Sequence, residues 1–297
     1  MLAAVWGSAF TAIKAGLEYF PPVLFAAVRY DLAGLIMLGY AVYATDRWRP
    51  RGKDEWLLVT IGGAFLIAAY HAFLFIGQQG TTSAAAAVVV SLSPVLTTGF
   101  ARGLLPDERL TMIGLVGLAL GFIGVVVLSN PDPNNLTDTR TLSLFLVFLA
   151  ALSFALGSVL TRRFETELPI ETMEAWAMLF GALLMHAISV GLAESVGDIQ
   201  WTGEALISLG YLSLVASAAG FLIYFDLLER LGPIEINLVS YAAPIAAAIT
   251  GLLFLGETPT VYTAAGFALI LCGFVLIKRR AIQKELRDAH SRGVSGD

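Results

Sequence analysis

The sequence predicts an all-α integral membrane protein with ten transmembrane helices, arranged as two inverted five-helix repeats. Three observations support this fold class: the composition, the lengths of the apolar segments, and a set of residues that recurs in the second half of the chain. Of the 297 residues, 57% are hydrophobic and only 14% are charged, whereas soluble domains contain about 25% charged residues. A lipid bilayer is therefore the solvent that this chain suits.

Ten apolar segments are long enough to cross a bilayer, which takes roughly 17 to 25 residues. The first one carries Lys14 and lacks the basic leader of a signal peptide, so it is predicted to be a membrane helix. Strands are not expected, because membrane-spanning strands show short alternating segments. The predicted helices cover residues 1–20, 22–44, 56–79, 83–103, 109–129, 140–161, 171–192, 205–228, 234–255 and 259–279.

The distribution of basic residues predicts the orientation in the cell membrane, because cytoplasmic segments are enriched in Lys and Arg. With the N-terminus inside, 15 of the 18 basic residues fall in inner segments or in the basic stretch that starts at Lys278 and continues through the predicted cytoplasmic tail at 280–297. Arg140 alone falls in an outer loop, and Lys14 and Arg29 lie within helices. Both termini are therefore predicted to be cytoplasmic.

The repeat is visible as pairs of identical residues 149 or 150 positions apart. Because each half contains five helices, an odd number, the second half must enter the membrane from the opposite face. Inverted repeats of this kind are typical of alternating-access transporters. The predicted repeats are residues 1–129 and 140–279, and the matching pairs are Pro94/Pro244, Glu108/Glu257, Gly117/Gly266 and Gly124/Gly273.

Pro94 and Pro244 are predicted to lie near the middle of their helices and to act as helix hinges. Each proline leaves a carbonyl four residues earlier, at Val90 or Ser240, without its usual partner. In lipid such a group needs a polar environment within the protein. We therefore expect the prolines to flank a central solute site, although an ordinary membrane-helix kink would give the same residue pattern.

Polar residues aligned on single helix faces are the candidates for that site. His71 is also the candidate for proton linkage, because imidazole titrates near neutral pH. The alternative for each hydroxyl group is a hydrogen bond to its own helix, and for His71 a satisfied place in the core. The predicted substrate-binding residues are His71, Gln78, Ser91, Thr98, Ser217, Tyr224, Asn237 and Tyr241.

Three charged residues lie inside predicted helices: Lys14, Arg29 and Asp31. Charges at the centre of a membrane helix are costly and usually paired. Asp31 is too short to reach the headgroups, so we expect it to pair with Lys14 on the neighbouring helix. For Lys14 and Arg29, snorkelling to the outer headgroups is the alternative.

One face of the predicted fifth helix consists of glycines. Gly114, Gly117, Gly121 and Gly124 are spaced three or four residues apart. Small residues at this spacing let two helix backbones approach closely. They are predicted to pack helices together rather than to bind a solute.

Three segments resemble the EamA family of the drug/metabolite transporter superfamily. They are "WGSAFTAIKAGLEYFPPVLFAAVRY" (6–30), "SLSPVLTTGFARGLLPDERLTMIGLVGLALGFIGVVVL" (91–128) and "YAAPIAAAITGLLFLGETPTVYTAAGFALILCGFVLI" (241–277). The resemblance implies ten helices in two inverted repeats, and the movement of small metabolites, often amino acids and frequently outward.

The expected function is that of a secondary transporter that moves a small polar metabolite, with export favoured. An importer or exchanger of anionic, phosphorylated solutes, bound by Lys14 and Arg29, is the alternative. Enzyme motifs such as H-E-x-x-H and G-x-S-x-G are missing, so an enzyme is not the preferred interpretation. A channel is not preferred either, because it would not need paired inverted repeats. One cysteine, three scattered histidines and a net charge of −5 predict no metal, cofactor or nucleic acid. Homo-oligomerisation stays open.

Overall fold

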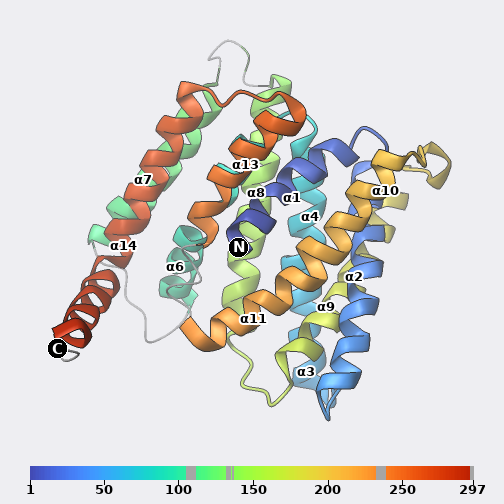
Figure 1. Cartoon of the computed structure of the whole chain (residues 1–297), viewed down its shortest axis with the longest axis horizontal. Helices are drawn as coiled ribbons and strands as arrows, with labels where there is room; N and C mark the ends of the chain where they lie inside the picture. Colours follow the sequence, from blue (N-terminus) through green and yellow to red (C-terminus); the bar gives the residue numbers. More distant parts are fainter. Residues whose placement is uncertain (105–111, 132–134, 136, 232–238, 295–297) are drawn as a thin grey trace.

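The computed structural model describes residues 1–104, 112–131, 135, 137–231 and 239–294, and this part of the chain forms a helical bundle (Figure 1). The helical elements follow one another with short connections. Their bounds are α1 Leu2–Gly16, α2 Pro22–Ala44, α3 Lys53–Ile61, η1 Gly62–Ala69, α4 Tyr70–Gln78, α5 Ser83–Val90, α6 Ser93–Leu104, α7 Met112–Ser129, α8 Thr139–Thr161, α9 Ile170–Gly191, η2 Val196–Asp198, α10 Gly203–Gly210, η3 Tyr211–Ala219, α11 Gly220–Leu231, α13 Val239–Leu255 and α14 Val261–Val294.

The predicted count of ten transmembrane segments is confirmed. Within the described residues, seven helical runs are long and apolar enough to cross a membrane. The shorter apolar helices α1, α13 and the first part of α14 complete the ten. The last helix, α14, extends beyond residue 279, the predicted end of the tenth transmembrane segment, and continues to Val294 through most of the charged tail.

Helices α2 and α9 form an antiparallel pair in which each N-terminus is held by the loop that follows the other helix. The carboxylate of Glu194 accepts hydrogen bonds from the backbone N–H of Val23 (3.1 Å) and of Leu24 (2.8 Å) at the start of α2. At the start of α9, the Thr172 hydroxyl donates to the Arg47 carbonyl (2.8 Å). The N-terminal N–H groups of a helix lack intrahelical partners, so Glu194 supplies acceptors that lipid would not.

Helices α7 and α14 pack through the repeated glycines, one from each half of the chain. A methyl group built on Gly117 would lie 2.6 Å from the carbonyl oxygen of Gly273, and one built on Gly124 would lie 2.8 Å from that of Gly266. The contacts are reciprocal, since a methyl group on Gly266 would lie 2.6 Å from the Gly124 carbonyl oxygen. The predicted packing role of the glycine face is confirmed at these positions.

Two segments of π-helix, which carries i→i+5 hydrogen bonds, interrupt the third and eighth transmembrane segments. They are η1 (Gly62–Ala69) and η3 (Tyr211–Ala219), and they lie 149 to 150 residues apart, as the repeated motifs do. Other helices bind their carbonyl groups: Ser153 donates to Phe65 (2.8 Å), and the Trp6 indole donates to Ala216 (3.2 Å). Such segments occur frequently at functional sites.

The glycine contacts lead to a first prediction. Gly117→Ala is expected to destabilise the protein, because overpacking typically costs about 1–3 kcal/mol. Gly39→Ala in α2 is the matched control, since no atom lies within 4 Å of the added methyl group. Thermal unfolding of the purified proteins in detergent measures both. Equal stability of the two variants would show that the backbones of α7 and α14 do not meet at this glycine.

Candidate functional site

Arg29 is a buried cation for which the described residues supply no counter-ion. Its side chain lies on α2, is 5% exposed, and donates one hydrogen bond from Nε to the Ser217 hydroxyl on η3 (3.1 Å). Among the residues that the structure describes, no carboxylate pairs with it, and its terminal amino groups have no hydrogen-bond acceptor. A guanidinium presents five donors in a rigid fork that matches a carboxylate or phosphate. Arg29 can therefore bind an anionic group.

His71 and Tyr30 form a buried network beside Arg29. The Tyr30 hydroxyl lies 2.8 Å from His71 Nε2, and His71 Nδ1 lies 2.8 Å from the carbonyl oxygen of Ile67. A carbonyl accepts only, so Nδ1 carries the proton and Nε2 accepts from Tyr30. The Tyr70 ring contacts the imidazole edge-on at 4.5 Å between centroids. Both nitrogens of the predicted proton-linked residue thus hold protein partners, which favours a fixed, neutral imidazole.

Glu174 is a polar residue that the sequence analysis did not select. It lies on α9 on the same face as the buried Met178 and Met185, and it is only partly accessible. Its carboxylate is within electrostatic range of the Tyr30 and Tyr224 hydroxyls. Within the described chain it has no hydrogen bond or ion pair. Its position one turn into a predicted helix made it look like a boundary residue, although its spacing from Met178 signals a buried face.

Tyr224 lies in an aromatic cluster with Trp6. The two rings are 5.6 Å apart between centroids, and Phe221 contacts Trp6 edge-on at 6.0 Å. Gly220 makes room for the indole, because a methyl group there would lie 2.9 Å from Trp6 Nε1. The cluster joins α1 of the first repeat to α11 of the second, so the predicted site residue Tyr224 lies between the two repeats.

The other predicted site residues do not gather around Arg29. Ser91 donates to the Val88 carbonyl (2.6 Å) and Thr98 to the Pro94 carbonyl (2.8 Å), so both hydroxyls bond to backbone of their own segment. Gln78 is fully buried, and its amide nitrogen donates to the Phe10 carbonyl while Oε1 has no partner in the described chain. The Tyr241 ring contacts the Phe274 ring in a tilted arrangement, with 4.4 Å between the centroids. Asn237 lies outside the described residues.

The span that contains Pro94 is interrupted near its middle, as predicted, but the carbonyl that Pro94 was expected to leave free has a partner. The chain breaks into α5 and α6 at residues 91 and 92, and Pro94 occupies the first turn of α6, where a missing N–H costs nothing. The Val90 carbonyl is not left free, since the Ser93 hydroxyl donates to it (2.7 Å). Pro244, in contrast, lies within the unbroken helix α13.

The predicted pair of Lys14 and Asp31 is wrong. Lys14 Nζ donates to the carbonyl oxygens of Gln78 (3.1 Å) and Gln79 (2.7 Å), at the C-terminal end of α4. Asp31 Oδ2 lies 2.7 Å from His186 Nε2 on α9, and the two side chains are 41% and 39% exposed. A lysine is favoured at a helix C-terminus, where unpaired carbonyls concentrate, and this attraction determines its partner.

The end of α4 and the start of α5 form a polar junction with the second repeat, here called the 79–83 junction. Glu257 Oε2 accepts from the backbone N–H of Ser83 (2.9 Å), and the Glu257 backbone N–H donates to Gly251 (3.0 Å). Lys14 donates to the carbonyl oxygens of Gln78 and Gln79, which lie just before this turn. One repeat thus supplies a cation for the carbonyls, and the other supplies a carboxylate for an N–H group.

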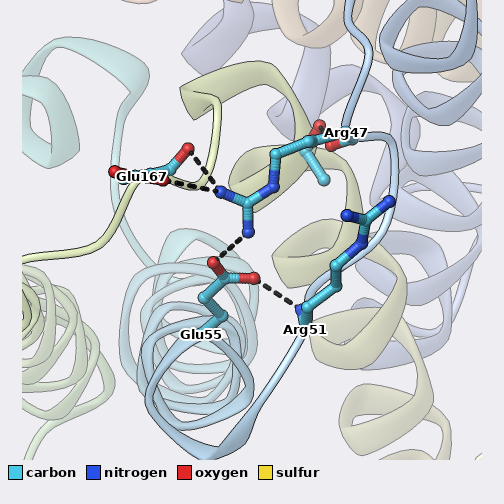
Figure 2. Close-up of polar contacts among 5 residues, drawn as sticks. Arg47, Arg51, Glu55 and Glu167 are labelled. Carbon is cyan, nitrogen blue, oxygen red and sulfur yellow. Dashed lines mark hydrogen bonds and ion pairs between the residues drawn. The ribbon is translucent and has the colours of Figure 1, made fainter.

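A second junction, here called the Arg47 junction, lies where the loop after α2 meets the loop before α9. Figure 2 shows the Arg47 guanidinium between Glu55, with which it forms an ion pair, and the exposed Glu167, at 3.6 Å. Glu55 also accepts from the backbone N–H of Arg51 (2.5 Å). This junction too connects the first repeat with the second.

Comparison with known proteins agrees with this architecture. The model of the EamA-like transporter family matches residues 1–130 and 141–279. The chain belongs to this family. A transporter of Archaeoglobus fulgidus, named as uncharacterized, is 28% identical over 276 residues, covering 93% of this chain and 95% of its own. The uncharacterized inner membrane transporter YedA of Escherichia coli is 27% identical over 285 residues, covering 92% and 87%.

A solved structure shares the fold of this EamA-like protein. This structure, described only as "Crystal structure of protein", superimposes on the chain with a TM-score of 0.65 at 23% sequence identity, and the match covers 94% of this chain and 95% of that one. The chain is therefore a multi-pass membrane transporter with two EamA repeats.

The corrected pairing of Asp31 leads to a second prediction. Asp31→Asn and His186→Gln should each destabilise the protein, and the double variant should lose less than their sum by about 0.5–3 kcal/mol, as expected for residues in contact. Thermal unfolding of the four proteins completes the cycle. Lys14→Met is the control and should add to Asp31→Asn. Coupling of Asp31 to Lys14 rather than to His186 would overturn the assignment.

Proposed function

We propose that the protein exports a small amino-acid-like metabolite across the cell membrane by alternating access between its two repeats. The observation that carries this proposal is the buried guanidinium of Arg29, which has the Ser217 hydroxyl and the Tyr30 ring as neighbours but no carboxylate partner among the described residues. An uncompensated buried charge is costly in a protein interior and more so in a membrane. A solute carboxylate supplies the missing counter-charge, and Ser217 orients the guanidinium for it.

Glu174 supports a solute that also carries an amine. By the rise of 1.5 Å per residue, Arg29 lies about 10 Å from the start of α2, and Glu174 lies about 6 Å from the start of the antiparallel helix α9. The two charges are thus separated along the helix axes by roughly 15–20 Å. They contact a small solute in succession, Glu174 near the cytoplasmic end and Arg29 deeper in the bundle.

The alternative solutes are anionic, phosphorylated metabolites, for which Lys14 and Arg29 would be the ligands. The ammonium of Lys14 already donates to two carbonyl groups at the 79–83 junction. Arg29 would have to hold such an anion alone, and Glu174 would repel it at the cytoplasmic end. These contacts favour the amino-acid-like solute.

The two junctions support alternating access. In the proposed orientation the 79–83 junction closes the external end of the interface between the repeats, and the Arg47 junction closes the cytoplasmic end. Opening either end requires breaking polar contacts at that end only. The π-helical segments η1 and η3 occupy equivalent places in the two repeats and are the proposed flexing points, in addition to Pro244.

The orientation is tested by the third prediction. In a Cys272→Ala background, Gly197→Cys should react with a membrane-impermeant thiol reagent in intact cells, because the loop before α10 is proposed to be external. Gly52→Cys should react only after permeabilisation. Both positions are exposed in the structure. The reverse pattern would place both termini outside and would reverse the assignment of the two junctions.

The solute class is tested by the fourth prediction, with purified protein in liposomes and a panel of amino acids, amines and sugar phosphates. Arg29→Gln should raise the KM for amino acids by about tenfold or more, because hydrogen bonds to charged groups contribute about 1.5–3 kcal/mol. Glu174→Gln should weaken the discrimination between amino acids and anions lacking an amine.

Leu35→Ala on the lipid-facing side of α2, where Leu35 is 60% exposed, is the matched control and should leave transport unchanged. Transport of sugar phosphates in preference to amino acids, with loss in Arg29→Gln, would favour the anion exchanger. An unchanged KM in Arg29→Gln would place the site elsewhere.

A further inference from the structure

A pocket of about 350 Å³ lies between α1, η3 and α13, and neither Arg29 nor Glu174 lines it. Residues of α1 come from the first repeat, and those of η3 and α13 come from the second. The lining residues are Ala4, Val5, Ser8, Tyr211, Ala246, Ile249 and Thr250.

The hydroxyl groups in the pocket already have partners. The Ser8 hydroxyl donates to the carbonyl of Ala4 (2.7 Å) and accepts from the Tyr211 hydroxyl at 2.6 Å. Thr250 donates to the Ala246 carbonyl (2.8 Å). With every hydroxyl hydrogen engaged, the lining offers a ligand mainly methyl and methylene surface. A polar solute would lose its hydration there without gaining a donor.

The mouth of the pocket is continuous with the lipid-facing surface. Ile249 lines it and is 53% exposed, and Leu253, one turn further along α13, is 71% exposed. On the opposite wall, Ile207 and Leu214 flank Tyr211 and are also exposed. In a membrane protein, exposed apolar side chains such as these contact lipid chains. The occupant therefore enters from the bilayer and not from water.

We propose that this pocket binds one hydrocarbon chain of a membrane lipid, inserted sideways between α13 and η3 against α1. Burial of methylene groups against the lining stabilises the chain, as burial of apolar surface does elsewhere. Since the lining comes from both repeats, a seated chain braces the interface that has to change during transport. A bound chain therefore favours the arrangement of the two repeats in which this pocket exists.

The test uses the full-length protein in nanodiscs that contain a phospholipid with a diazirine in the middle of one acyl chain. After illumination, mass spectrometry should find adducts in the peptides that contain Val5 and Ile249. A water-soluble diazirine amino acid, used in parallel, should not label these positions. Absence of lipid adducts there, or labelling by the water-soluble probe, would overturn the proposal.

A filled pocket gives the fifth prediction. Ala4→Trp places a ring in the space lined by the exposed Ala4 and should lower the lipid adducts at Ile249 by about tenfold, because the ring replaces the methylenes that would be buried there. Leu253→Trp puts the same ring on the lipid-facing surface outside the pocket and should leave the adducts unchanged. Equal labelling in both variants would mean that the adducts come from bulk lipid.

Discussion

In a bilayer, every backbone polar group has to find its partner inside the protein, and this constraint shapes the irregular parts of the bundle. At several places where a described helix breaks or changes its hydrogen-bond pattern, a side chain takes the exposed group. Ser93 takes the carbonyl of Val90 at the break between α5 and α6. Trp6 takes the carbonyl of Ala216 in η3. In η1 and η3 these bonds also join the two repeats, since Ser153 binds Phe65 and Trp6 binds Ala216.

Several charged side chains also bind backbone groups in this way, and Arg29 and Glu174 differ from them because they do not. Lys14, Glu194 and Glu257 all bind backbone groups at helix ends, where the helix dipole favours their charge. These hydrogen bonds offset the free-energy cost of placing the three charges in the membrane. Arg29 has one hydroxyl partner and Glu174 has no partner among the described residues, so these two side chains keep unused capacity for a charged solute.

The sequence predicted the helices, the repeat and the glycine contacts, because these depend on composition and on periodic spacing. Gly117 and Gly273 belong to a pattern that can be recognised without coordinates. The π-helical segments could not be predicted, since an i→i+5 hydrogen bond leaves no signature in residues 62–69. The partner of Lys14 was missed for a different reason. Pairing charges by depth ignores helix-end carbonyls, and it is these that bind the ammonium of Lys14.

At the candidate site, Arg29, His71, Ser217 and Tyr224 were found from their polarity within apolar helices. Ser91 and Thr98 share that polarity but bond to their own segments, and sequence alone does not separate the two cases. Glu174 was missed because a charged residue one turn from a helix end can be either a boundary residue near the membrane surface or part of a buried helix face. Glu174 shares a helix face with Met178 and Met185, but this indicates burial only once the structure shows that this face of α9 is the buried one.

The glycine contacts between α7 and α14 restrict how the repeats can move. Sliding one helix along the other would move each glycine away from the carbonyl oxygen that it faces, so that residues with side chains would have to enter spaces that accept only a hydrogen atom. The glycines therefore restrict α7 and α14 to one register, and in this register the last helices of the two repeats are held together.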